Sequence, residues 1–107
     1  MKLMTQEELD GKTTEIESNG LRFPVFDAGD GSPILLVHGF PDSRMIWRNV
    51  ITPLLAAGHR VIAPDLRGLG DSSRPLTGYD KKTVANDVWR LVNDELGHRK
   101  FYLVGHD

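Results

Sequence analysis

The sequence predicts an α/β fold built on a mainly parallel sheet that begins with an antiparallel hairpin. Three observations support this fold class. An Asn-Gly pair separates two strand-like stretches near the start. An apolar run at residues 34–37 and a further buried strand at residues 60–64 follow, and helical patterns separate the later strands. Parallel neighbours need a long crossover, so strands that alternate with helices favour a parallel sheet. The length of 107 residues allows one small domain, which we place at residues 12–107.

The beginning of the chain predicts a polar end followed by a hairpin. Residues 1–11 are polar, and we expect this N-terminus to be frayed. Residues 13–17 have a strand-like composition. Asn19 and Gly20 can adopt the positive φ angles of a tight turn, so we expect residues 21–27 to return antiparallel to the first strand.

The middle of the chain predicts a buried strand and a helix. Residues 34–37 are apolar at every position, as in a strand that is covered on both faces. We expect a short turn over residues 44–49. A helix should then begin with Thr52 as its N-cap and Pro53 in its first turn, and should end at Gly58.

The second half repeats this alternation of strand and helix. Residues 60–64 form the next buried strand, and residues 65–78 form a long polar loop with four glycine or proline breaks. An amphipathic helix follows, with apolar residues at helical spacing: Val84, Val88, Leu91, Val92 and Leu96. Gly97 ends this helix, and residues 101–104 form the last strand.

Composition excludes several classes of function. Thirteen Lys and Arg against fifteen Asp and Glu give a net charge of -2, which disfavours nucleic-acid binding. The absence of cysteine excludes disulfides and thiolate metal sites and fits a reducing, cytoplasmic location. The longest aliphatic run, residues 34–37, is too short to span a membrane, and residues 1–11 contain no signal-peptide core. No cofactor is expected, and no metal either, because no paired ligand spacing connects His38, His59, His98 and His106.

The active site of such a sheet lies beyond the carboxyl ends of its strands. Three loops begin there, at His38, Asp65 and Gly105. In the first, Gly39 lets the backbone approach a ligand and Pro41 stiffens the turn. This loop is either an oxyanion-stabilising loop that uses a backbone amide or a tight turn in which an aromatic residue packs.

The second loop, residues 65–72, contains glycines but lacks the spacing of a nucleotide-binding fingerprint. We therefore interpret it as a hydrogen-bonded loop that Asp65 and Arg67 stabilise, and that shapes the floor of a pocket. The third loop places Asp107 two residues after Gly105, as at the start of a nucleophile elbow. A carboxylate there can attack a carbon and form an ester; the alternative is an ordinary polar strand end.

Together these segments resemble the amino-terminal part of an α/β-hydrolase-fold enzyme of the epoxide hydrolase and dehalogenase branch. The segment at residues 38–41 is similar to the His-Gly-X-Pro oxyanion loop of that family, and residues 64–72 are similar to the loop after its fourth strand. Residues 105–107 are similar to the start of its Gly-X-Asp-X-Gly elbow. Serine esterases and lipases of this fold would place Ser at position 107, so the resemblance implies an Asp nucleophile and a strand order of 1-2-4-3-5.

The resemblance implies a two-step hydrolysis. Asp107 would form an ester with the substrate, and a His would then activate water to hydrolyse that ester. The amides of Phe40 and of the residue after Asp107 would stabilise the oxyanion. The residues expected to support the pocket are His38, Gly39, Pro41, Asp65, Arg67 and His106. We do not expect His106 to be the base, because an elbow points that side chain away from the nucleophile.

Epoxide hydrolysis is the activity that the resemblance favours, because an aromatic residue at position 40 and the pattern of residues 67–72 are similar to that group. Fluoroacetate-type dehalogenases share the aromatic residue, whereas haloalkane dehalogenases more often have a polar residue there, so a dehalogenase is the alternative. The expected partners are a small epoxide or organohalide, and water. A non-catalytic, truncated chain is a further alternative.

The family's catalytic acid, catalytic His and cap domain have no counterpart in the 107 residues. We therefore expect this chain alone to be inactive and poorly soluble, with the strand at residues 101–104 as a bare apolar edge. A C-terminal half or a second chain would supply the remaining parts.

Overall fold

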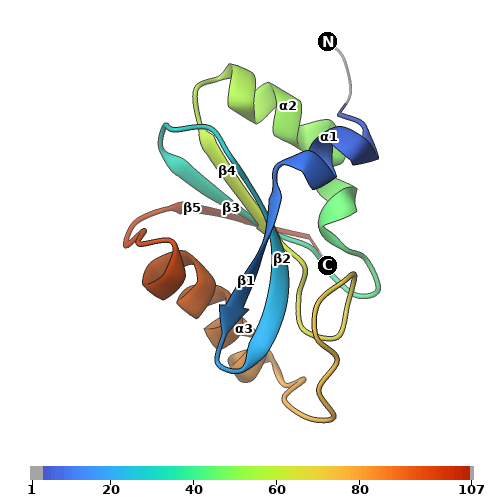
Figure 1. The fold of residues 1–107 in the computed structure, drawn as a ribbon. Helices are drawn as coiled ribbons and strands as arrows, with labels where there is room; N and C mark the ends of the chain where they lie inside the picture. Colours follow the sequence, from blue (N-terminus) through green and yellow to red (C-terminus); the bar gives the residue numbers. More distant parts are fainter. Residues whose placement is uncertain (1–3, 107) are drawn as a thin grey trace.

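The computed structural model describes residues 4–106 and consists of one sheet with helices on both faces (Figure 1). The strands are β1 (Thr13–Ser18), β2 (Leu21–Ala28), β3 (Pro33–Val37), β4 (Arg60–Pro64) and β5 (Tyr102–Gly105). The helical elements are α1 (Gln6–Gly11), the short 3-10 helix η1 (Arg44–Trp47), α2 (Arg48–Ala56), α3 (Lys81–Trp89) and the π-helix η2 (Arg90–Glu95). The sheet order β1-β2-β4-β3-β5 confirms the predicted α/β fold and strand order.

The sheet combines an antiparallel beginning with a parallel remainder. Strand β2 is antiparallel to β1 and β4, and β3 is parallel to β4 and β5. The turn between β1 and β2 has positive φ angles at both Asn19 (52°) and Gly20 (78°). A two-residue hairpin turn of type I′ requires a positive φ at both of these positions. The predicted hairpin is confirmed.

The N-terminus differs from the sequence prediction. Residues 6–11 form α1 and are not frayed, while residues 1–3 lie outside the described part of the chain. The Thr5 side chain accepts a hydrogen bond from the Glu8 amide, and the Glu8 carboxylate accepts one from the Thr5 amide. This capping box satisfies two amides that the first turn would leave without partners. Leu9 is fully buried, which anchors the helix to the core.

The start of α2 also differs. We predicted Thr52 as the N-cap, but the helix begins at Arg48, directly after η1, and Pro53 lies inside it. Ser43 caps η1 by accepting a hydrogen bond from the Met45 amide. Proline removes the amide that would bond to the carbonyl of Asn49. Because Asn49 is exposed, water can satisfy that carbonyl.

The second helical region agrees with its amphipathic pattern. Helix α3 begins at an N-cap, Asp80, and continues into η2, whose last turn ends before Gly97 (φ 78°). Val88, Leu91 and Val92 are buried against the sheet. The predicted helix is confirmed, and the wider π turns in its second half are a structural finding.

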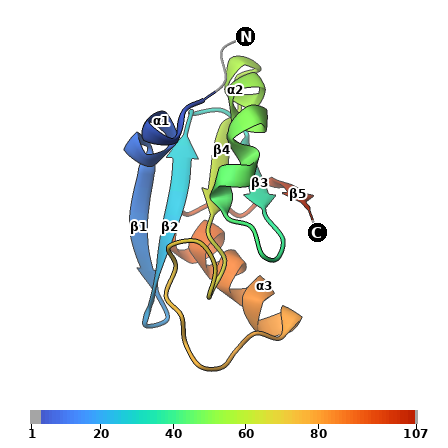
Figure 2. The same ribbon diagram turned by 90° about the vertical axis from the view of Figure 1, so that its right-hand side faces the viewer.

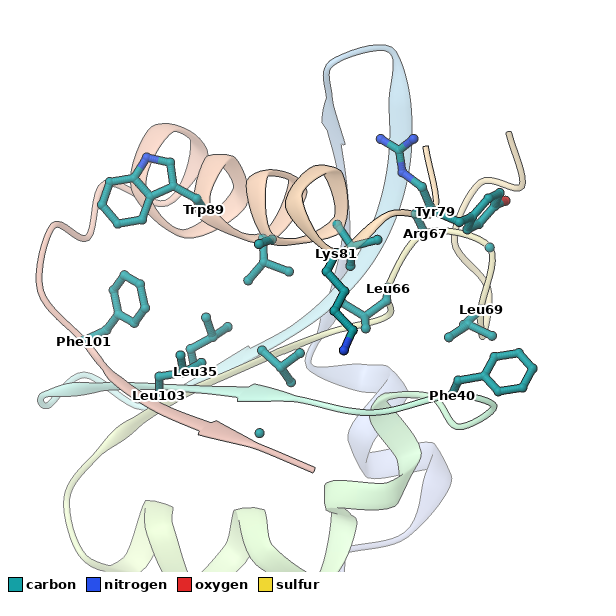
Figure 3. Close-up of a pocket in the computed structure, with 16 residues that line it drawn as sticks. Leu35, Phe40, Leu66, Arg67, Leu69, Tyr79, Lys81, Trp89, Phe101 and Leu103 are labelled. Atoms are coloured by element: carbon teal, nitrogen blue, oxygen red, sulfur yellow. The ribbon is translucent and has the colours of Figure 1, made fainter. Parts of the chain in front are cut away.

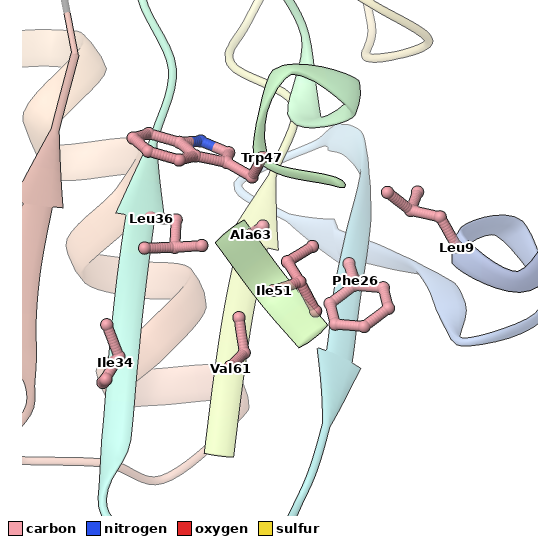
Figure 4. Packing of buried hydrophobic residues seen from close by; sticks show 8 residues of the cluster. All are labelled: Leu9, Phe26, Ile34, Leu36, Trp47, Ile51, Val61 and Ala63. Atoms are coloured by element: carbon pink, nitrogen blue, oxygen red, sulfur yellow. The ribbon is translucent and has the colours of Figure 1, made fainter. Parts of the chain in front are cut away.

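Two apolar clusters cover the two faces of the sheet. The cluster on the side of α1 and α2 consists of Leu9, Phe26, Ile34, Leu36, Trp47, Ile51, Val61 and Ala63 (Figure 4). The cluster on the side of α3 consists of Phe23, Val25, Leu35, Ile62, Val88, Leu91 and Val92. Neighbouring residues of β3 enter opposite clusters because side chains alternate along a strand. Strand β5 lies at the edge, and its Tyr102 and Leu103 are 64% and 65% exposed, as expected for a bare edge.

Candidate active site

Loops follow the carboxyl ends of β3 and β4, and β5 ends at the same end of the sheet (Figure 2). The His106 amide donates a hydrogen bond to the Val37 carbonyl (3.1 Å), which joins the end of β5 to the end of β3. His106 is exposed. Asp107, the predicted nucleophile, lies outside the described residues. Within the described residues, the structure therefore places the end of β5 beside the end of β3, where the first loop begins.

His38 connects the first two loops. It is buried, and its Nε2 accepts a hydrogen bond from the Leu66 amide (3.0 Å). Its Nδ1 lies 2.9 Å from the Gly39 carbonyl oxygen, and the same oxygen accepts a hydrogen bond from the Asp42 amide (2.8 Å). The imidazole thus fixes the backbone of its own loop against the loop that follows β4.

The Phe40 amide is without an intramolecular acceptor, from the backbone or from a side chain, in the described part of the chain. The Phe40 side chain is 80% exposed, so the alternative in which this aromatic residue packs inside a tight turn is wrong. The Phe40–Pro41 peptide bond is cis. The loop therefore leaves the Phe40 amide without an acceptor and its side chain exposed, within residues 4–106.

Asp65 is the centre of the second loop and is fully buried. Its carboxylate accepts hydrogen bonds from the Arg44 amide (2.7 Å) and the Asp71 amide (2.9 Å), and it forms an ion pair with the Arg44 guanidinium. A Cβ atom at Gly70 would lie 2.3 Å from this carboxylate, and φ there is +53°, so glycine is required. Asp65 stabilises the loop, as predicted.

Arg67 points away from the sheet edge and toward α3. Its Nε and Nη2 donate to the two carboxylate oxygens of Asp87 (2.7 and 2.8 Å), and Nη1 donates to the Thr77 carbonyl (3.0 Å). The hydrogen bond to Asp87 raises the pKa of Arg67. Arg67 therefore fastens the long loop to α3.

An apolar hollow of about 1000 Å³ lies between α3 and the sheet, beside β5 (Figure 3). Phe40 and Leu69 lie at one end of it, and Trp89 and Phe101 lie at the other, with their ring centroids 6.2 Å apart. The hollow continues the exposed apolar surface of β5. None of the helices in residues 4–106 has the length and hydropathy of a membrane span.

Sequence reasoning missed two residues that hold the site. Arg44 pairs with Asp65, and Asp87 pairs with Arg67. These partners lie 21 and 20 residues apart in the chain, so no local spacing connects them. Arg44 lies at the beginning of the turn that follows the first loop, which could have marked it as a residue near the site. Nothing in the sequence indicates that its side chain is buried.

The comparisons with known proteins agree with the fold. A family profile described as the alpha/beta hydrolase fold matches residues 32–107. The chain is 55% identical over 89 residues to a soluble epoxide hydrolase of Corynebacterium sp. (strain C12), covering 83% of this chain and 30% of that protein. It is 42% identical over 103 residues to epoxide hydrolase A of Mycobacterium tuberculosis, covering 91% of this chain and 32% of that protein.

Solved structures give the same picture. The unliganded epoxide hydrolase CorEH matches with a TM-score of 0.81 at 50% identity, over 89% of this chain and 33% of that one. An epoxide hydrolase of Vigna radiata matches with a TM-score of 0.83 at 37% identity, over 89% of this chain and 31% of that one. The chain thus spans about a third of the length of the proteins it matches.

Proposed function

This chain belongs to the α/β-hydrolase-fold family, and from that premise we propose that it is the amino-terminal part of an epoxide hydrolase whose nucleophile is Asp107. The observation that carries the proposal is the Phe40 amide. It has no acceptor in residues 4–106 and lies at the sheet edge where β5 leads toward position 107. The names of the relatives support an epoxide as the substrate.

The first step is carboxylate attack on an sp3 carbon. An Asp107 carboxylate oxygen forms a bond to one epoxide carbon, and the bond from that carbon to the epoxide oxygen breaks. The oxygen leaves as an alkoxide that takes up a proton from an acid supplied by the rest of the protein. The product of this step is a hydroxyalkyl ester of Asp107.

The second step is hydrolysis of that ester. A water molecule, deprotonated by a base beyond residue 107, adds to the carbonyl carbon of the ester and gives a tetrahedral oxyanion. The Phe40 N–H and the amide of the residue after Asp107 donate hydrogen bonds to this oxyanion. Collapse of the intermediate breaks the bond between the Asp107 carbonyl carbon and the alkyl oxygen. The proton of the added hydroxyl passes to that alkyl oxygen, which releases a diol and restores the carboxylate. The proton held by the base returns to the acid that was used in the first step.

The remaining predicted residues have supporting roles in this proposal. His38, Gly39 and Pro41 shape the loop that presents the Phe40 amide. Asp65 and Arg67 hold the neighbouring loop, which keeps the edge of the sheet rigid. His106 is exposed and takes no part in proton transfer. The partners are a small epoxide and water, and the cysteine-free composition supports a cytoplasmic location.

The test is turnover by the full-length protein. We expect the wild type to convert styrene oxide to its diol, and Asp107→Ala to lower the rate at least ~10³-fold because no ester can form. Asp30→Asn, at an exposed loop position, serves as the matched control and should retain full activity. Wild-type activity in the Asp107→Ala variant would contradict the assignment.

The same assay separates the epoxide from the halide alternative. The full-length protein is offered fluoroacetate and a 1-chloroalkane beside styrene oxide. Halide release without diol formation would replace the proposal with a dehalogenase. Failure to act on any of the three would favour the non-catalytic alternative.

A further inference from the structure

His38 makes two hydrogen bonds whose directions determine its protonation state. The Leu66 amide can only donate, so the His38 Nε2 atom that faces it at 3.0 Å must carry a lone pair. The single proton of the neutral ring therefore lies on Nδ1. From there it is donated to the Gly39 carbonyl oxygen at 2.9 Å. One tautomer satisfies both contacts, and burial of the ring leaves water little access to either.

The Gly39 carbonyl in turn determines where the next amide points. It accepts hydrogen bonds from His38 Nδ1 and from the Asp42 amide, which holds the peptide plane between Gly39 and Phe40 from two sides. That peptide is trans, so its C=O and N–H groups point in opposite directions. The Phe40 N–H is consequently directed away from His38 and Asp42, where it has no acceptor in residues 4–106.

We infer that His38 is the positioning residue of the oxyanion amide, and that its Nδ1–H tautomer, fixed by the Leu66 amide, sets the orientation of the Phe40 N–H. This inference rests on the proposed function and deepens it. His38 contacts no reacting atom. It acts on ester hydrolysis alone, because only that step builds negative charge on the ester carbonyl oxygen.

Two amide side chains separate the two hydrogen bonds of His38. The Asn side-chain nitrogen occupies a place near Nδ1, so His38→Asn retains a donor for the Gly39 carbonyl and loses the acceptor for Leu66. The longer Gln side chain reaches the place of Nε2, so His38→Gln retains an acceptor for Leu66 and loses the donor for Gly39. The two variants both carry a neutral amide side chain and differ in which of the two hydrogen bonds of His38 they keep.

The experiment measures the two chemical steps in the full-length protein with styrene oxide as the probe. Rapid quenching followed by intact mass spectrometry gives the rate at which the ester adduct forms and the rate at which it disappears. We expect adduct formation to stay within about threefold of the wild type in both variants, because the oxyanion amide does not act in that step. We expect adduct loss to slow roughly 10- to 100-fold in His38→Gln and to stay within about fivefold in His38→Asn.

Equal rates of adduct loss in the two variants would overturn the inference, and so would an equal slowing of both steps in His38→Gln. A wild-type protein that forms no adduct contradicts the proposed function instead, so the two failures are distinguishable. If His38→Gln does not fold, the side-chain ¹⁵N shifts of His38 in the wild type decide. A protonated Nδ1 with an unprotonated Nε2 supports the inference, and the opposite tautomer or an imidazolium overturns it.

Discussion

The loops after β3 and β4 begin at the same end of the sheet, where both strands have their carboxyl ends, and they use their polar groups in opposite ways. After β4, Asp65 is fully buried and its carboxylate accepts hydrogen bonds from Arg44 and from the Asp71 amide. After β3, the Phe40 amide has no acceptor in residues 4–106, and its side chain is 80% exposed. The loop after β4 is built around a buried carboxylate whose hydrogen bonds support the fold. The loop after β3 instead leaves the Phe40 amide at a strand end without an acceptor in residues 4–106.

The largest effect on stability is expected when the buried ion pair between Asp65 and Arg44, in the loop after β4, is broken. Asp65→Asn removes the charge that compensates the buried Arg44, and we expect the free energy of unfolding of the full-length protein to fall by about 3 kcal/mol. Urea unfolding provides the measurement. Asp71→Asn is the control, because that side chain is 79% exposed and lies 3.6 Å from the same guanidinium; it should cost less than about 0.5 kcal/mol. Equal losses in the two variants would mean that Asp65 does not hold the loop.

The second test concerns the bidentate pair of Arg67 with Asp87. Arg67→Lys keeps the positive charge but loses the planar fork, and we expect a loss of about 1.5 kcal/mol in unfolding free energy. Arg48→Lys, at an exposed position of α2, should change it by less than about 0.5 kcal/mol. An unchanged stability of Arg67→Lys would show that the fork geometry is not what fastens the loop to α3.

A smaller effect is expected where the supporting loop enters α3. The Thr83 hydroxyl and amide donate to the Asp80 carboxylate and lower the pKa of Asp80 below its usual value. A lowered folded pKa means stabilisation that is present above the usual pKa of Asp and is lost as the pH falls through the folded value. Asp80→Ala should therefore lower the melting temperature at neutral pH, and the difference from the wild type should shrink in acid. A difference that grows in acid would contradict the cap.

The smallest effect on stability should come from the loop after β3. Phe40→Ala truncates a side chain that is mostly exposed, so we expect the unfolding free energy to change by less than about 0.5 kcal/mol. The same urea experiment measures it. A loss as large as that of Asp65→Asn would remove the distinction between the two loops.

The parts of the fold that follow from local chemistry could be predicted from the sequence. Asn19 and Gly20 determined the hairpin, and apolar runs placed β3 and β4. The order of the strands came from the family resemblance and not from any spacing. The pattern Thr5 to Glu8 is a readable capping box, but the polar composition around it led to an expectation of fraying. Burial of Leu9, which stabilises α1, depends on packing that composition does not indicate.

The candidate site divides in the same way. The loops that begin at His38 and Asp65 were predicted because polar residues follow apolar strands. Arg44 was missed because its pairing with Asp65 exists only once β3 and β4 are neighbours. The predicted start of α2 was wrong. Pro53 is typical of a first helical turn, but the helical conformation already begins at η1 and continues into α2 at Arg48. Tertiary contacts decided both cases.

The most direct test of the central claim is a single turnover of styrene oxide by the full-length protein in H₂¹⁸O, with the protein in excess. If water attacks the carbonyl carbon of an Asp107 ester, the label enters the Asp107 carboxylate and the diol stays unlabelled. Peptide mass spectrometry shows whether Asp107 carries the ¹⁸O label, and mass spectrometry of the diol shows whether the product carries it. A labelled diol with an unlabelled Asp107 would mean that water opens the epoxide directly, and would contradict the account.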